Sequence, residues 1–409
     1  MPLRTLVVHY AEIGTKGRNR PQFERRLMAH LGLALKDVGI SAGVKRMPGR
    51  LTVLLPEGSD PEVALARLAK VAGVADVACG VAVPADLASI SAAAVDLLAA
   101  GPPGSFKLEV RRGDKTFPLD SIAVARQVGA ACVAASGRRV DVHRPDVTVH
   151  IEIPSKVALV IGPSRPGPGG LPSGSTGRLL AFLSGGLDSP VAAWKMMRRG
   201  ARVTAVHFWN RTLQGNAVLE KIEDLCRVLA LTQGEVPLVV VPFEPMQRAI
   251  VAMVPEHVRM VVYRRAMLRI ASALADREKA LGYVTGDSLG QVASQTAENL
   301  RSIHAVADRP VFAPLIGDDK VDVVALARKL GTFEISIRPH EDCCSFLVAA
   351  HPATRTRPDV IARLEEGIPW DALVAEALAG ARREVHHASG RTTAVASDDP
   401  PAVDAPPVP

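Results

Sequence analysis

The sequence has few cysteines, and their spacing suits neither a disulfide framework nor paired CxxC zinc knuckles. The five cysteines are odd in number and mostly far apart, at positions Cys79, Cys132, Cys226, Cys343 and Cys344. Small secreted domains and zinc-binding modules show denser, paired spacings. We therefore expect reduced thiols and no bound structural metal.

Long apolar runs and aromatic residues are also scarce. No run approaches the roughly 18 apolar residues that a membrane span requires, and the start "MPLRTLVVHYAEIGTKGRNR" lacks the charged-then-apolar order of a secretion signal. We expect a cytoplasmic protein without membrane contact. Aromatic residues make up 4% of the chain. Base stacking on an exposed aromatic sheet is therefore not expected to be its main mode of nucleic-acid binding.

Positive charge is concentrated in the N-terminal half. Residues 1–50 contain ten Lys or Arg against three acidic residues, and residues 101–140 contain seven against three, within a net charge of +7 for the chain. A solvated basic face is the alternative explanation for either cluster alone. Two such clusters favour a polyanionic partner, because neutralising phosphates releases counterions and supplies most of the affinity for nucleic acid.

The order of apolar and turn-forming segments predicts several domains. Strand and helix patterns alternate in two small α+β domains over residues 1–58 and 59–165, and the Pro, Gly and Ser stretch from residue 163 predicts a flexible linker at 166–177. Apolar strands separated by helical segments predict an α/β domain with a parallel sheet at 178–385. The Pro, Ala and Asp content of residues 386–409 predicts a disordered tail.

A glycine turn in "FLSGGLDSPVAAWKMMRRG", residues 182–200, is the strongest signal in the chain. It predicts a strand, a tight turn and a helix, with Ser189 as N-cap and Pro190 at the first helical position. Gly185 and Gly186 would let backbone N–H groups approach an anion, and the helix start adds partial positive charge. A nest of this kind suits pyrophosphate, although the segment has no lysine of the Walker type. The alternative is a glycine turn that binds nothing.

The segment SGGLDS resembles the signature of the PP-loop ATP pyrophosphatases, which split ATP between its α and β phosphates. Further blocks are similar to the tRNA 4-thiouridine synthetases (tRNA uracil 4-sulfurtransferases), in the same order along residues 1–360: "AEIGTKGRNRPQFERRL", "RRGDKTFPLDS", "SGGLDSPVA", "VTAVHFWN", "YRRAMLRIA", "TGDSLGQVASQTAENL" and "ISIRPHEDCCSF". The resemblance implies a ferredoxin-like domain, a THUMP domain that grips the acceptor end of tRNA, and a C-terminal PP-loop domain, as in the adenine nucleotide alpha hydrolase-like fold. It also implies adenylation of a uridine in tRNA (its 4-position, at position 8), release of pyrophosphate, and replacement of oxygen by persulfide sulfur.

The resemblance implies a set of site residues, with ATP and Mg²⁺ as cofactors and Asp188 positioning the metal ion. The implied ATP contacts are Phe182, Leu183, Ser184, Gly185, Gly186, Asp188, Ser189, His207, Phe208, Arg264, Gly286 and Gln295. The expected tRNA contacts, from the two basic clusters, are Lys16, Arg18, Arg20, Lys107, Arg111, Arg112 and Lys115. Taken singly, these residues could equally be core residues, a solvated helix face or a helix cap.

The sulfur step needs a thiol, and the resemblance implies Cys343, in "HEDCCSF", as the catalytic cysteine. It would carry sulfur or resolve a disulfide formed on transfer. Asp342 and Glu341 would tend to raise the pKa of the Cys343 thiol, and Cys344 could substitute or assist. The other three cysteines are expected to be small core residues.

Two family features are not found in the sequence. No rhodanese-like segment follows "WDALVAEALAG", so the expected persulfide source is a partner, a cysteine desulfurase, or Cys343 itself. A role in forming the thiazole of thiamine is then doubtful. No CxxC is present, so an iron–sulfur cluster is not expected. A homodimer is possible, and the sequence does not decide the oligomeric state.

Two rival functions remain open at this level. One is a PP-loop amidotransferase or ligase that acts on another adenylated substrate, which predicts a glutaminase domain that the sequence does not show. The other is an RNA-binding module with a degenerate PP-loop, which the intact SGGLDS disfavours.

Overall fold

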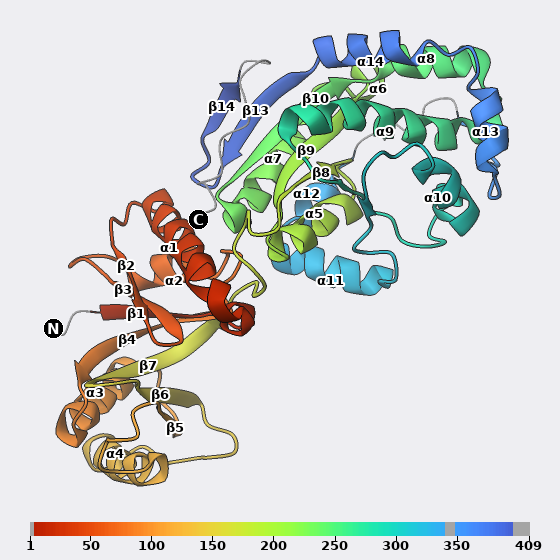
Figure 1. Ribbon diagram of the computed structural model, residues 1–409. Helices are drawn as coiled ribbons and strands as arrows, with labels where there is room; N and C mark the ends of the chain where they lie inside the picture. Colours follow the sequence, from red (N-terminus) through yellow and green to blue (C-terminus); the bar gives the residue numbers. More distant parts are fainter. Residues whose placement is uncertain (1–3, 340–347, 396–409) are drawn as a thin grey trace. The chain divides into compact units, whose positions relative to one another are not determined.

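The computed structural model describes residues 4–339 and 348–395. The chain forms two compact units, Met1–Pro172 and Ser173–Pro409 (Figure 1). Within the described residues, no helix combines the length and the apolar character needed to cross a membrane.

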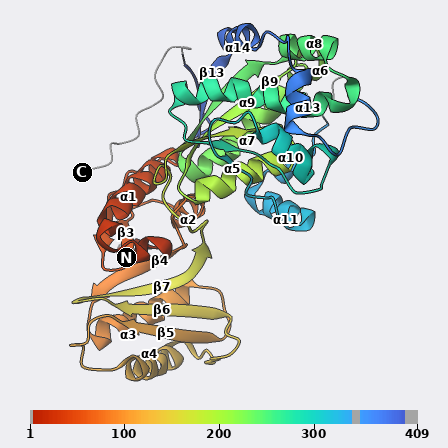
Figure 2. The same cartoon turned by 45° about the vertical axis from the view of Figure 1, so that its right-hand side comes forward.

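The first unit is built on one seven-stranded sheet in the order β2-β3-β1-β4-β7-β6-β5. Only β5 and β6 pair in parallel, and the other neighbours are antiparallel. The strands are β1 (Arg4–His9), β2 (Val44–Met47), β3 (Arg50–Leu54), β4 (Asp76–Pro84), β5 (Phe106–Arg112), β6 (Val147–Ile153) and β7 (Val157–Pro166). Figure 2 shows β7, β6 and β5 side by side in this sheet.

Four helices pack on this sheet: α1 (Arg20–Asp37), α2 (Pro61–Leu68), α3 (Leu87–Ala100) and α4 (Ser121–Ser136). Three of them begin at an aspartate N-cap, Asp60, Asp86 or Asp120, whose carboxylate accepts a hydrogen bond from a backbone N–H of the first turn. Apolar residues of α1 and α2 form one core with β1 and β3, and those of α3 and α4 form another with β5 and β6. The α+β expectation for this half is confirmed.

The expected boundary after residue 58 differs from the structure. Helix α2, which we had assigned to the second domain, contributes Ala64, Leu65 and Leu68 to the same core as α1. The two halves share the long strands β4 and β7, which pair along most of their length. Because the apolar face of α2 is buried against α1, α2 belongs to the first small domain. The boundary between the two small domains therefore falls within β4.

The second unit has a seven-stranded sheet in the order β12-β11-β8-β9-β10-β13-β14. Its first five strands are parallel: β12 (Val311–Phe312), β11 (Tyr283–Val284), β8 (Arg178–Phe182), β9 (Arg202–Trp209) and β10 (Glu235–Pro242). The antiparallel hairpin of β13 (Arg382–His387) and β14 (Thr392–Val395) extends it.

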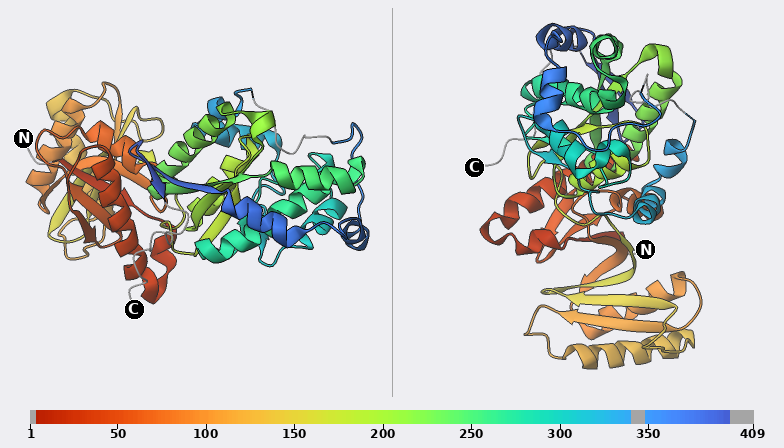
Figure 3. Two further views of the ribbon diagram at one scale, coloured as in Figure 1. Left: turned by 90° about the horizontal axis from the view of Figure 1, so that it is seen from above. Right: turned by 90° about the vertical axis from the view of Figure 1, so that its right-hand side faces the viewer.

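Helices lie on both sides of this second sheet (Figure 3). One core joins the sheet to α8 (Glu244–Met253), α9 (Arg259–Glu278) and α14 (Trp370–Ala379), and another joins it to α5 (Asp188–Arg198), α7 (Ala217–Gln233) and α11 (Lys320–Leu330). The remaining short helices are α6 (Arg211–Gln214), α10 (Ala297–His304), α12 (Phe333–Ser336) and α13 (Pro358–Leu364). This doubly covered parallel sheet is the expected α/β architecture.

Two expectations about irregular segments were wrong. The start of the expected tail, from His386, lies in the hairpin, where β13 bonds to β10 and His386 is fully buried. Its polar composition concealed a strand whose backbone groups pair with β10 on one side and β14 on the other. Part of the expected linker is also ordered: β7 runs to Pro166, and Leu171 packs into the core with α1.

Candidate active site

The SGGLDS turn connects β8 to α5 at the carboxyl end of the parallel strands. Gly185 has a φ of +85°, a conformation that favours glycine. The Ser189 hydroxyl lies 3.1 Å from the Ser184 backbone N, which donates to it, and the Ser184 hydroxyl accepts from the Gly186 N–H at 3.3 Å. The helix begins at Asp188 with Leu187 as N-cap, so the expected N-cap role of Ser189 is wrong. Its side chain bonds back into the turn instead.

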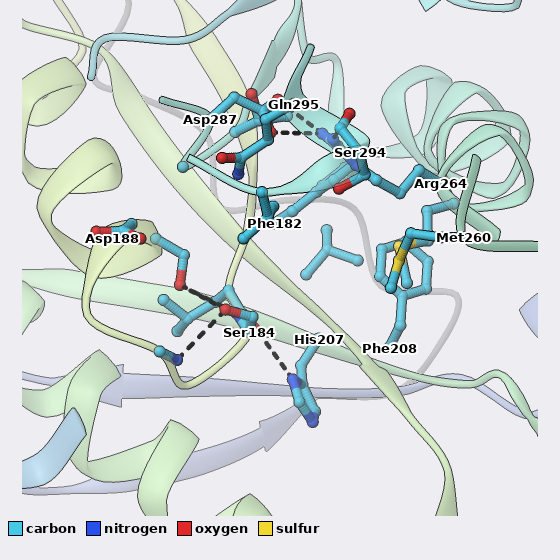
Figure 4. Close-up of a pocket in the computed structure, with 18 of the residues that line it drawn as sticks. Phe182, Ser184, Asp188, His207, Phe208, Met260, Arg264, Asp287, Ser294 and Gln295 are labelled. Atoms are coloured by element: carbon cyan, nitrogen blue, oxygen red, sulfur yellow. Dashed lines mark hydrogen bonds and ion pairs between the residues drawn. The ribbon is translucent and has the colours of Figure 1, made fainter. Parts of the chain in front are cut away.

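A pocket opens beside this turn (Figure 4). Eleven of the twelve residues expected to contact ATP line it, and only Gly185 does not. Figure 4 shows Asp188 and Arg264 at opposite sides, with Phe182 between them. The sequence did not indicate the remaining lining residues: Val206, Met260, Met267, Thr285, Asp287, Val292, Ala293, Ser294 and Pro352. Thr285, Asp287 and Ser294 are polar and the other six are apolar, so no residue type marks the set, and only the fold brings it together.

The Asp188 carboxylate is held by two side chains from distant segments. The Lys320 ammonium, at the start of α11, donates to its two oxygens at 2.6 and 2.8 Å, and the Gln291 amide donates to one of them at 3.0 Å. The Lys320 side chain is 44% exposed, so it can move to a ligand. Lys320 could not be identified from the sequence, because nothing in "GDDKVDV" distinguishes it from a solvated helix start.

Arg264, on α9, forms a two-pronged ion pair with Asp287 at 2.7 and 2.6 Å. It also donates to the Ser294 carbonyl at 3.3 Å. The Asp287 side chain is nearly buried, at 4% exposed. This pair fixes the Arg264 guanidinium at the wall of the pocket and joins the segments 285–287 and 293–295.

Gly286 lies against the turn so closely that no side chain fits there. A Cβ at this position would be 2.9 Å from the Ser189 backbone nitrogen and 3.1 Å from the Asp188 carbonyl carbon. Such contacts are shorter than van der Waals separations. The "TGDS" segment therefore packs its backbone directly on the first turn of α5.

Two buried polar atoms in the pocket lack a hydrogen-bond partner among the described residues. Within the described part of the chain, Thr285 Oγ1 and Gln295 Oε1 are buried and have no hydrogen-bond partner. Buried polar atoms usually have partners, since an unsatisfied one costs free energy. Both residues line the pocket, so a ligand with matching donors and acceptors would satisfy them.

A buried lysine anchors the chain segment opposite the turn. Lys221, on α7, is 1% exposed, and its ammonium donates to the carbonyls of Ser336 at 2.7 Å and Arg338 at 2.9 Å. The Ser336 hydroxyl in turn donates to the Gly186 carbonyl at 3.2 Å. Burial, with a smaller effect of nearby Arg338, lowers the pKa of Lys221 to about 8. Lys221 thus connects α7, the end of α12 and the glycine turn.

Replacing Lys221 by methionine should reduce the free energy of unfolding by about 1–3 kcal/mol, because two carbonyls lose their donor. The folded-state pKa lies below that of an unfolded lysine, so wild-type stability relative to the variant should rise as the pH increases from about 8 to about 10.5. Chemical denaturation across this pH range measures both effects. Lys329→Met, on an exposed lysine of α11, is the control. Equal stability of the two variants would contradict the anchoring role.

The expected catalytic cysteines, Cys343 and Cys344, lie outside the described residues. The other three are poor nucleophiles. Cys132 and Cys226 are fully buried, as expected, and Cys79 is partly buried against the core around α1. Burial raises the pKa of all three thiols, that of Cys132 to about 11.

The seven basic residues expected to contact tRNA differ in their surroundings. Arg18, Arg111 and Lys115 are exposed. Arg20 donates to Glu24 at 2.8 Å and to the Tyr10 hydroxyl at 2.6 Å, while Arg112 holds the carbonyls of Phe117 and Leu119. Lys16 and Lys107 each pair with a nearby glutamate. The exposed three are the best placed to bind a polyanion.

Comparisons with known proteins cover both units. Residues 174–369 match the family described as "Thiamine biosynthesis protein (ThiI)", residues 5–78 match the "ThiI ferredoxin-like domain", and residues 84–161 match the "THUMP domain". The chain is 42% identical to the "Probable tRNA sulfurtransferase" of Moorella thermoacetica, over 91% of this chain and 95% of that one. It is 43% identical to the protein of the same name from Thermus thermophilus, over 91% of each chain.

Solved structures agree with these sequence matches. A "4-thiouridine synthetase - RNA complex with bound ATP" superposes with a TM-score of 0.84 at 33% identity, covering 94% of this chain and 99% of that one. PH1313 from Pyrococcus horikoshii Ot3, at 24% identity and a TM-score of 0.63 over 80% of this chain and all of that one, shares the fold. The chain therefore belongs to the tRNA sulfurtransferase (ThiI) family.

Proposed function

We propose that this protein is an ATP-dependent tRNA sulfurtransferase that converts a uridine of tRNA, at position 8, to 4-thiouridine. The observation that carries the proposal is the pocket built on SGGLDS, in which the Asp188 carboxylate is held by Lys320 at the edge of the parallel sheet. The similarity to tRNA sulfurtransferases over 91% of the chain supplies the substrate class.

ATP binds with its adenine ring in the apolar part of the pocket and its phosphates at the glycine turn. Phe182 and Phe208 form an edge-on aromatic pair there, with ring centroids 5.4 Å apart. Thr285 Oγ1 and Gln295 Oε1 are the atoms best suited to bond the adenine edge. The turn and the start of α5 provide backbone N–H groups for the pyrophosphate portion.

Charge develops on the pyrophosphate as the uridine 4-oxygen attacks the α-phosphorus and the bond to the β-phosphate bridge breaks. The Lys320 ammonium lies close enough to the turn to neutralise it, once it exchanges Asp188 for phosphate oxygens. Asp188 would hold Mg²⁺, which supplies further neutralisation when bound. A single carboxylate fits this ion, since Mg²⁺ usually keeps several waters and binds through substrate phosphates.

Sulfur transfer then replaces AMP at carbon 4 of the uracil. We propose that Cys343, which the family resemblance implies, is the functional thiol, with Cys344 as its neighbour. The thiols of Cys132 and Cys226 are fully buried, and burial raises the pKa of the partly buried Cys79. The terminal sulfur of the Cys343 persulfide attacks carbon 4, and AMP leaves with its electron pair. A second thiol then attacks the Cys343 sulfur, which releases the 4-thiouridine and leaves a disulfide that an external thiol reductant must reduce. A cysteine desulfurase supplies the persulfide.

The first unit binds the tRNA. Exposed Arg18, Arg111 and Lys115 contact the phosphate backbone, because backbone contacts position a nucleic acid without needing base stacking. The THUMP match at residues 84–161 includes the second of these basic clusters.

The decisive experiment combines purified protein, unmodified tRNA, Mg-ATP and sodium sulfide, which bypasses the persulfide donor. Thiolated tRNA is retarded in a mercury-containing gel, and we expect retardation that requires ATP. Pyrophosphate release without tRNA thiolation would instead favour another adenylated acceptor, as in a PP-loop amidotransferase or ligase. Absence of both would overturn the proposal.

Replacing Lys320 by methionine should lower kcat for thiolation on the order of 10²-fold, because one positive charge at the leaving pyrophosphate is lost. The KM for ATP should change much less. Lys329→Met removes an exposed lysine from the same helix and is the matched control. Equal kcat values for the two variants would remove Lys320 from the mechanism.

A further inference from the structure

A second cavity in the C-terminal unit is rich in positive charge and belongs to no site described above. It is lined by Trp209, Arg211, Asn216, Val240, Pro242, Gly380 and Arg382. These residues come from the ends of β9 and β10, the short helix α6, the start of α7 and the start of β13. No carboxylate is among them.

The two arginines of this cavity are not held by any carboxylate within hydrogen-bond distance in the described part of the chain. Within the described ranges, the guanidinium groups of Arg211 and Arg382 have no hydrogen-bond or ion-pair partner. Arg382 lies over the Trp209 ring, 5.2 Å from its centroid. The acidic Glu384 lies two residues along β13 and pairs with His386 at 3.0 Å, which lowers the pKa of Glu384, and the positive charge of Arg382 lowers it further. Two unpaired guanidiniums converging on one cavity indicate an anionic ligand.

The cavity is also built rigidly enough to position a ligand. The Trp209 indole N–H donates to the Gly215 carbonyl at 3.0 Å, and its backbone carbonyl accepts from Phe243 at 2.9 Å. The backbone of Arg382 is held in the sheet, because Arg382 of β13 lies opposite Val240 of β10. The Asn216 side chain makes no capping bond to α7, so its amide remains open to a ligand.

The position of the cavity relates it to the nucleotide pocket. Phe208 lines the nucleotide pocket and Trp209, the next residue of β9, lines the second cavity. Both sites therefore lie at the carboxyl end of the same strand, where ligands of open α/β sheets bind. The side chains of Phe208 and Trp209 point to opposite faces of the sheet, so a substrate that contacts both sites must extend across this end of the sheet, as a macromolecule can.

We propose that this cavity, the Arg211–Arg382 cavity, binds a backbone phosphate of the RNA substrate near the nucleotide that reacts. The inference depends on the proposed function for the identity of the substrate, and it adds a contact in the C-terminal unit to those of the basic clusters. Guanidinium groups match a phosphate better than any other common RNA group, because they donate parallel hydrogen bonds. Free pyrophosphate has the same chemistry, and the experiment separates the two.

The test is the double variant Arg211→Gln and Arg382→Gln. The KM for tRNA in thiolation should rise about tenfold, as expected for loss of a charge-assisted contact, while the KM for ATP stays within about twofold. The slope of log KM against log salt should fall by about one, since about one phosphate contact is lost. Arg363→Gln, which removes an exposed arginine from α13, is the matched control.

Several outcomes would overturn the inference. A tRNA KM equal to that of the control, or an equal rise in the KM for ATP, would exclude a specific RNA contact. Weaker inhibition by pyrophosphate with an unchanged tRNA KM would assign the cavity to the released product. Because Arg211 is exposed, Arg211→Gln alone covers the case in which the double variant does not fold. It should give part of the rise in the tRNA KM.

The proposed function and this inference can fail separately. If the wild-type protein does not thiolate tRNA, direct binding of fluorescent tRNA still compares the double variant with Arg363→Gln. Weaker binding with a lower salt slope would support the cavity as an RNA site. Identical binding curves would overturn it.

Discussion

Replacing Asp188 by asparagine is expected to lower the rate of ATP-dependent tRNA thiolation on the order of 10³-fold. The side chain keeps its size, but loses the negative charge that holds Lys320 in place and would hold Mg²⁺. Both pyrophosphate release and thiolation should fall together, because the adenylation step precedes sulfur transfer. Pyrophosphate release and mercury-gel retardation measure the two steps in one reaction mixture.

The matched control for this variant is Asp322→Asn, which removes an exposed carboxylate from the first turn of α11, close in sequence to Lys320. Its activity should stay near that of the wild type. Nucleotide binding to the Asp188 variant, measured with Mg-ATP and with ATP alone, separates a damaged pocket from a lost metal contact. An Asp188 variant within about threefold of the wild-type rate would exclude Asp188 from the chemistry, since loss of one transition-state contact usually costs more.

Replacing Cys343 by serine is expected to stop persulfide-dependent thiolation while tRNA-dependent pyrophosphate release continues. A hydroxyl cannot carry sulfane sulfur or cleave the S–S bond, whereas adenylation of the uridine needs no thiol. The loss should be at least about 10²-fold with a cysteine desulfurase and cysteine as the sulfur source. Sodium sulfide as the donor should restore much of the product, because sulfide attacks the adenylated uridine without a carrier thiol.

Cys344→Ser is the comparison for that variant, because it removes the neighbouring thiol and leaves Cys343 in place. Loss of activity only in the Cys344 variant would make Cys344 the functional thiol and Cys343 its neighbour. Full activity in both single variants would exclude a carrier function for either cysteine alone. Cys226→Ser is not a suitable control, since that thiol is fully buried in the core and its replacement would test packing.

The sequence alone located the glycine turn and most of the segments that line the pocket beside it, because they are contiguous motifs. SGGLDS and TGDSLGQVASQT each encode a local backbone shape, and Gly185 with its positive φ and Gly286 with no room for a side chain show why these glycines stand there. Alternating apolar segments fixed the α/β class of the second unit. The aspartate caps of the first unit were present in the sequence, although we did not use them.

The tertiary structure decided what depends on contacts between distant segments. Lys320 reaches Asp188 across 132 positions, and Lys221 reaches the end of α12 across 115, so no local pattern marks either residue. The Arg211–Arg382 cavity joins residues from opposite ends of the second unit, one of them in a segment whose composition predicted disorder to begin four residues later. Burial and hydrogen bonding with a neighbouring strand ordered that segment. Local sequence specifies backbone shape and periodicity, whereas pairing between distant charges and the burial of a polar strand depend on the folded sheet that brings them together.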